Sequence, residues 1–230
     1  PHVYDLSEML TPGEHSISIR VDNANLPPVG PCHAVDERTQ TNWNGIIGRI
    51  ELQARAPIWI DNFQATPNVE QRRFEVRLTL RNRSSWQGDG EVTVSAESAE
   101  VPTVHFTPLV SVQSIQGSET HCSLQFDIPE KFPCWDEFQP ALLRLSVKLE
   151  CRSDTEVHVD EQSMMTGCRS FRTEKSQFSI NGQRTFLRGR HDACIFPLTG
   201  YPPMDKKGWI RVFQIGKSYG LNHHRFHSWC

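Results

Sequence analysis

No apolar run in this 230-residue sequence approaches the roughly 18 to 20 residues that span a bilayer, so we expect no membrane partner. The sequence also lacks an excess of charge of one sign, because 24 basic residues face 27 acidic ones and the net charge is −3. A binding site for nucleic acid normally needs a basic surface, so we expect no nucleic-acid partner. Internal repeats and low-complexity segments are absent, and the composition is that of an ordinary globular protein.

The seven cysteines show no CxxC spacing, which argues against a zinc site or a redox motif. We therefore predict no metal and no cofactor. Cys122 and Cys151 fall on the inward-facing positions of expected strands, where cysteine behaves as a small apolar residue. A chain of this length needs no disulfide scaffold, so most of the thiols are expected to be free and buried.

The first 56 residues combine strand-like and irregular sequence. His15 to Val21 alternates apolar and polar residues, which predicts a half-buried strand. A long irregular stretch follows, and Ile46 to Leu52 is again typical of a strand. Ala56-Pro57 is interpreted as a domain boundary.

Residues 57–167 have the alternation of a β-sandwich. Around seven short strands in about 110 residues, separated by turn residues, are typical of an antiparallel two-sheet sandwich of immunoglobulin type. We expect seven side chains to lie inside it: Phe74, Val76, Leu78, Leu124, Phe126, Leu145 and Val147. Shorter strands are predicted at Ile58 to Ile60, Val104 to Phe106 and Val157 to Val159.

The pattern changes after Gly167. Asn181-Gly182 lies between two alternating runs and predicts a hairpin with a two-residue turn. Asp205 is a suitable helix N-cap and Gly220 a suitable C′ glycine, so a helix is expected between them. Leu221 to Phe226 is predicted to be a strand. Together with the helix and the strand before it, this strand forms the first β-α-β unit of a parallel α/β fold.

Several segments together resemble the family 2 glycoside hydrolases. The similarity rests on Asn42 to Ile50, on Trp135-Asp136-Glu137 with Pro140 and Leu143, on Phe178 to Gly189, and on Gly220-Leu221-Asn222 with Arg225. The resemblance implies three domains: the end of a jelly-roll sugar-binding domain over 1–56, an immunoglobulin-like sandwich over 57–167, and the start of a (β/α)₈ barrel over 168–230. The expected fold is therefore mainly β, with the first β-α-β unit of a truncated catalytic barrel at its end.

The resemblance also implies substrate-binding residues. His191 and Asp192 take the places of the family's sugar-contacting histidine and acidic residue, and Arg225 matches the arginine of its second barrel strand. His227 is expected to substitute for a histidine that the family has one position later, where this sequence has Ser228. Asn42 matches the glucuronidase-like version of the jelly-roll loop.

Retaining glycoside hydrolysis needs two carboxyl groups about 5 to 5.5 Å apart. Neither of the family's catalytic glutamate motifs occurs in the sequence, so no catalytic residue is assigned and the 230 residues alone are expected to be inactive. Adjacent acids such as Asp136-Glu137 and Asp160-Glu161 are interpreted as solvated loop charge.

The resemblance implies an exo-acting β-glycosidase with a carbohydrate substrate, and homo-oligomers are possible. The preferred interpretation is that the chain is part of a β-galactosidase-like enzyme. The alternative is that it is part of a β-glucuronidase-like or β-mannosidase-like enzyme. A non-catalytic sandwich that binds glycans or a protein is the second class of function.

Overall fold

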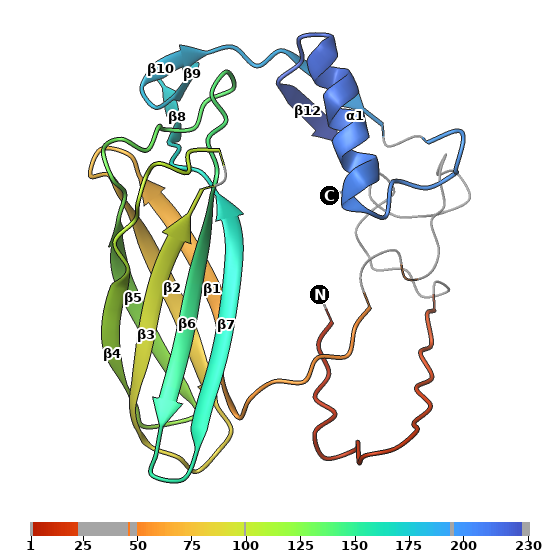
Figure 1. Ribbon diagram of the computed structural model, residues 1–230. Coiled ribbons are helices and arrows are strands. Elements are labelled where there is room, and N and C mark those ends of the chain that lie inside the picture. The colour runs from red at the N-terminus through yellow and green to blue at the C-terminus, as the bar shows by residue number, and fades with distance from the viewer. Residues whose placement is uncertain (1, 23–45, 47–49, 99, 194–195, 227–230) are drawn as a thin grey trace. The chain divides into compact units, whose positions relative to one another are not determined.

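The computed structural model describes residues 2–22, 46, 50–98, 100–193 and 196–226 (Figure 1). The chain divides into two compact units, Leu52–Leu187 and a second unit made of Pro1–Glu51 and Arg188–Cys230. The described residues are mainly β, with antiparallel sheets and one α-helix.

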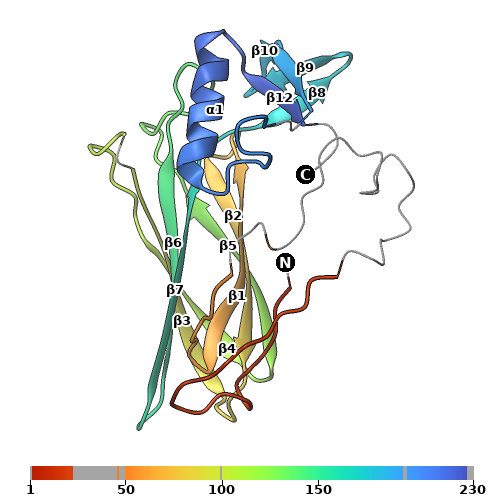
Figure 2. The same ribbon diagram turned by 90° about the vertical axis from the view of Figure 1, so that its right-hand side faces the viewer.

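Two antiparallel sheets face each other in the first unit (Figures 1 and 2). One sheet has the strand order β1-β2-β5, from β1 (Ile58–Asn68), β2 (Arg73–Asn82) and β5 (Glu119–Asp127). The other has the order β4-β3-β6-β7, from β3 (Gly88–Glu97), β4 (Leu109–Ile115), β6 (Leu143–Arg152) and β7 (Val157–Thr166). The sandwich predicted from the alternation is confirmed as a two-sheet architecture.

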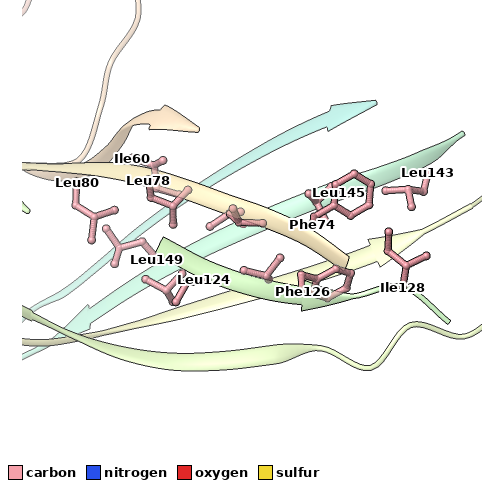
Figure 3. Close-up of a cluster of buried hydrophobic side chains, with 14 of the residues drawn as sticks. Ile60, Phe74, Leu78, Leu80, Leu124, Phe126, Ile128, Leu143, Leu145 and Leu149 are labelled. Carbon is pink, nitrogen blue, oxygen red and sulfur yellow. The ribbon is translucent and has the colours of Figure 1, made fainter. Parts of the chain in front are cut away.

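The apolar side chains of the two sheets point toward each other and form one core (Figure 3). In β2 every second residue from Phe74 to Leu80 is buried, and β6 buries every second residue from Leu143 to Cys151. All seven side chains expected inside are buried, and Leu124 is the most exposed of them at 9%. The alternation of apolar and polar residues in the sequence thus located the core correctly, because successive strand residues face opposite sides of a sheet.

One edge of the sandwich is closed by side chains rather than by strand pairing. The pairing of β1 with β2 shifts register between Ile60 and Asn62. The Ile60 amide donates to Asp160 Oδ2 of β7 at 2.8 Å, and Gln162 Nε2 of β7 donates to the Ile60 carbonyl. The interpretation of Asp160 as solvated loop charge was therefore wrong, because this carboxylate lies on a strand and satisfies a backbone amide at an irregular point of the opposite sheet.

A small third sheet lies at one end of the sandwich (Figures 1 and 2). It contains β8 (Phe171–Glu174), β9 (Gln177–Ile180) and β10 (Gln183–Thr185) in the order β10-β9-β8. Asn181 and Gly182 form the turn between β9 and β10 with φ of 51° and 75°. Two positive φ values are those of a type I′ turn, so the predicted hairpin is confirmed.

The second unit contains β11 (Gly189–Asp192), α1 (Lys206–Ser218) and β12 (His223–Phe226). Asp205 caps α1 through a 2.7 Å hydrogen bond from the Gly208 amide. At the other end Gly220 has φ 79°, its amide donates to Lys217 O, and the Leu221 amide donates to Gly216 O. These two bonds form a Schellman motif, so both predicted helix ends are confirmed.

Two predicted strands do not form. Residues 15–21 form no strand pairing with any other described residue, and Ile17 is 60% exposed. Alternation alone does not make a strand, because its backbone groups need a neighbouring strand. Residues 104–106 likewise lie in a connecting segment between β3 and β4. Of the strand expected at 46–52, residues 46 and 50–52 are not in a strand, and 47–49 lie outside the described residues.

Candidate functional site

The candidate site lies on the parallel pair of strands in the second unit. β11 and β12 pair in parallel with His191 beside Arg225 and Asp192 beside Phe226. Residues that are paired in this way point to the same face of a sheet, and their neighbours point to the other face. His191 and Arg225 are both exposed and share one face. The structure therefore brings these two predicted site residues together.

The opposite face of the strand pair is covered by α1. Trp209 packs edge-on against Phe226 with ring centroids 5.6 Å apart, and Phe213 packs edge-on against His224 at 5.3 Å. Gly216 is the buried residue of the helix, and a Cβ at this position would lie 2.6 Å from His224 Nε2. The glycine lets the helix backbone approach the His224 ring, and His191 and Arg225 point away from this interface.

Asp192 lies on the helix-covered face, not beside His191. Its side chain is 6% exposed and forms an ion pair with Arg190. Both residues act on His224, the strand partner of Arg190. Burial lowers the pKa of His224 below its ordinary value and the positive charge of Arg190 lowers it further, while Asp192 opposes the shift.

The beginnings of the two strands are fixed to each other by a reciprocal contact. The Asn222 amide donates to Arg188 O at 3.0 Å, and the Arg188 amide donates to Asn222 Oδ1 at 2.8 Å. Arg188 Nε also donates to Gly220 O at 2.9 Å, just past the end of α1. Two of the sequence segments that carry the family resemblance thus meet here, and their role is to set the register of β11 against β12.

A second contact, within the first unit, joins the hairpin segment to a third segment that carries the resemblance, the one that begins at Trp135. Asn181 Nδ2 donates to Trp135 O at 3.0 Å, and Asn181 Oδ1 accepts from the Ser170 amide at 2.8 Å. The Arg169 guanidinium lies over the Trp135 indole, with its Cζ atom 4.5 Å from the centroid of the indole ring. Asn181 is therefore both a turn residue and the connection between the hairpin and a sandwich loop.

Sequence reasoning missed Arg190 as part of this region, and it did not place His224 under the helix. The signal that could have found it is the alternation of side chains along a strand. This alternation puts Arg190 and Asp192 on one face of β11 and His191 on the other. Asn42 and His227, also predicted to contact substrate, lie outside the described residues. Among the residues that the structure describes, no group of three or more His, Cys, Asp or Glu side chains could hold a metal ion. No described helix is long and apolar enough to cross a membrane.

No family model matches the sequence. A curated protein from Formosa agariphila, named putative beta-glucuronidase, is 26% identical over 189 residues, which are 81% of this chain and 22% of that protein. Among solved structures, Bacteroides uniformis beta-glucuronidase superimposes with a TM-score of 0.61 at 18% identity, over 74% of this chain and 21% of its own. A glycosyl hydrolase family 2 member from Bacteroides cellulosilyticus superimposes with a TM-score of 0.57 at 18% identity, over 74% of this chain and 23% of its own.

The chain has the fold of the family 2 glycoside hydrolases. The resemblance inferred from the sequence is thereby confirmed. A family 2 beta-galacturonidase from Eisenbergiella tayi, bound to galacturonate, superimposes with a TM-score of 0.58 at 21% identity, over 76% of this chain and 29% of its own. The chain spans about a fifth of the length of the curated relative, for which 22% is covered.

Proposed function

We propose that the chain is part of a retaining, exo-acting β-glycosidase that removes terminal β-linked uronic acids. The observation that carries the proposal is the agreement of the named relatives, which are a putative beta-glucuronidase, a beta-glucuronidase and a beta-galacturonidase bound to galacturonate. They favour the glucuronidase-like alternative over the galactosidase-like interpretation that the sequence placed first.

The domain assignment is part of the same proposal. Residues 1–56 would close a jelly roll, 57–167 would form an immunoglobulin-like sandwich and 168–230 would begin a (β/α)₈ barrel. The strand orders β1-β2-β5 and β4-β3-β6-β7 support the sandwich, because seven antiparallel strands split between two sheets are typical of that architecture. The parallel pairing of β11 and β12 around α1 supports the barrel.

The substrate would bind on the face that carries His191 and Arg225. In a (β/α)₈ barrel the helices form the outer ring, so the strand face opposite α1 points inward. A guanidinium forms two parallel hydrogen bonds with a carboxylate, which makes Arg225 a suitable partner for the carboxylate of a uronic acid. His191 would donate to a sugar hydroxyl beside it, and His227 and Asn42 remain proposed contacts. Asp192, which was also predicted to contact substrate, lies on the helix-covered face and is not proposed as a contact.

The catalytic carboxyl groups are proposed to lie outside these 230 residues. A retaining mechanism places an acid/base and a nucleophile about 5 to 5.5 Å apart, and a closed barrel needs eight strands. The chain would therefore contribute binding groups and a scaffold, and the bond-breaking groups would come from the rest of the enzyme.

The test uses the intact reading frame that contains this chain. Its kcat/KM is measured on the nitrophenyl β-glucuronide, β-galacturonide, β-galactoside and β-mannoside. We expect a uronide to be preferred, and Arg225→Ala to lower kcat/KM for that uronide roughly 100-fold, since a hydrogen bond to a charged group contributes about 1.5 to 3 kcal/mol.

Arg211→Ala is the matched control, because Arg211 is an exposed arginine of α1 in the same unit and should leave turnover unchanged. Preference for a neutral glycoside would contradict the uronide assignment. Unchanged uronide turnover in Arg225→Ala would contradict the assignment of Arg225.

A further inference from the structure

Two cysteines that are distant in the sequence lie side by side at one end of the sandwich. Cys134 Sγ and Cys168 Sγ are 3.9 Å apart, although the residues are separated by 34 positions. Cys134 lies in the loop before β6 and Cys168 in the segment that follows β7. Their backbones are also joined, because the Trp135 amide donates to Cys168 O at 2.9 Å. The sulfurs are thus already in contact, and a disulfide would shorten their separation to roughly 2.05 Å.

A guanidinium is held against this pair. Arg72 lies in the turn between β1 and β2 with φ 51°, and its side chain donates to Cys134 Sγ at 3.0 Å. The same guanidinium donates to the carbonyls of Pro129, at 2.6 Å, and of Phe132. These bonds hold the guanidinium beside the Cys134 sulfur.

We propose that Cys134 and Cys168 form a redox-sensitive pair, which a small-molecule disulfide oxidises to a disulfide bond that clamps the Trp135 loop to the segment leaving the sandwich. Half-buried Cys134 is the sulfur that the reagent reaches, whereas Cys168 is fully buried. The other two cysteines of the described residues, Cys122 and Cys151, lie on separate sheets.

The reaction proceeds by two exchanges. The Cys134 thiolate attacks one sulfur of the reagent RSSR, forms a Cys134–SR mixed disulfide and releases RS⁻. The Cys168 thiolate then attacks Cys134 Sγ and releases the second RS⁻. Each protein thiol loses its proton to solvent or to the released thiolate, so two protein thiols and RSSR give one protein disulfide and two RSH.

The environment of Cys168 determines this order. Burial raises the pKa of Cys168 to about 12, and Cys134 contributes to the rise, while Arg72 opposes it. Cys168 is therefore a poor first nucleophile. Once Cys134 is in the mixed disulfide it carries no negative charge, its contribution to the Cys168 pKa disappears, and the second attack is intramolecular.

The bond would stiffen the exit from the sandwich. Trp135, next to Cys134, accepts a hydrogen bond from Asn181 of the β9–β10 hairpin. Gly167, next to Cys168, packs closely on the same loop, because a Cβ there would lie 3.0 Å from Trp135 Cβ. A covalent link at this point would fix the loop to which the small third sheet is attached.

The test equilibrates the 230-residue chain with oxidised glutathione or with dithiothreitol at mildly alkaline pH. Free thiols are then alkylated, and the digested peptides are identified by mass spectrometry. We expect a bridged Cys134–Cys168 peptide after oxidation, both residues alkylated after reduction, and a Tm that is higher in the oxidised chain by about 5 to 10 °C.

Cys168→Ser should stop the reaction at a Cys134–glutathione mixed disulfide, whereas Cys122→Ser, the matched control on β5, should leave the bridge intact. Complete alkylation of Cys134 and Cys168 after prolonged oxidation would overturn the proposal. So would a stable mixed disulfide at Cys134 in the unsubstituted chain.

Discussion

Arg188 and Asn222 hold each other through two hydrogen bonds across 34 residues of sequence, with the Arg188 amide donating to Asn222 Oδ1 and the Asn222 amide donating to Arg188 O. Between them lie β11 and α1, so this contact closes the β-α-β unit before the strand pair begins. The register that places His191 beside Arg225 starts from this point.

Removing the Asn222 side chain should loosen the strand pair. Asn222→Ala leaves the Arg188 amide without its side-chain acceptor, and because this contact is exposed to solvent the loss should be about 0.5 to 1.5 kcal/mol. We expect faster hydrogen exchange of the β11 and α1 amides. Asn222→Asp keeps an oxygen acceptor and is the matched control, so an equal effect of both variants would contradict the role given to Oδ1.

Gly216→Ala should destabilise the second unit although alanine favours helices. Helix propensity alone predicts a gain of about 1 kcal/mol. The added Cβ would meet His224 Nε2 at 2.6 Å, and overpacking typically costs about 1 to 3 kcal/mol. Urea unfolding followed by Trp209 fluorescence measures the net change.

Shortening the opposing side chain provides the control for this prediction. In a His224→Ala background, Gly216→Ala should become stabilising, because the contact is removed and only the helix propensity remains. If Gly216→Ala had the same effect in both backgrounds, the His224 contact would not be its cause.

Two substitutions at Asn181 should separate its turn conformation from its hydrogen bonds. Asn181→Gly keeps the positive φ but removes the contacts to Trp135 O and the Ser170 amide, at a cost of about 1 to 3 kcal/mol. Asn181→Ala should cost about 1 kcal/mol more, because alanine is strained in the left-handed region. Chemical denaturation of the first unit measures both, and equal losses would show that the turn conformation contributes nothing.

The second unit should lose stability on acidification through His224. The pKa of His224 is lowered in the folded chain, so between that pKa and the unfolded value of about 6.5 the unfolded state binds more protons. Stability from this group is therefore present above about pH 6.5 and is lost as the pH falls through the unfolded pKa. An NMR titration of the imidazole resonances should place the midpoint of His224 below the ordinary histidine value, and a midpoint at or above that value would contradict the effect of burial.

Much of the first unit could be predicted because its information is local. The alternation in β2, β5 and β6 identified the buried faces, Asn181-Gly182 specified the hairpin turn, and Asp205 marked the start of α1. In each case the signal is a property of one short segment. β4 was missed because Val110 and Val112 point outward on an edge strand while Ser111 and Gln113 face inward, which reverses the usual pattern.

By itself the sequence determined which residues alternate, turn and cap, because these preferences depend on a few neighbouring residues. It also indicated the resemblance to the family 2 glycoside hydrolases, through segments whose contacts are visible only in the structure. The tertiary structure decided that Arg188 meets Asn222, that Asn181 meets Trp135, and that His191 lies beside Arg225. These relationships depend on strand register and on the packing of α1, and no local pattern encodes a register between segments more than 30 residues apart.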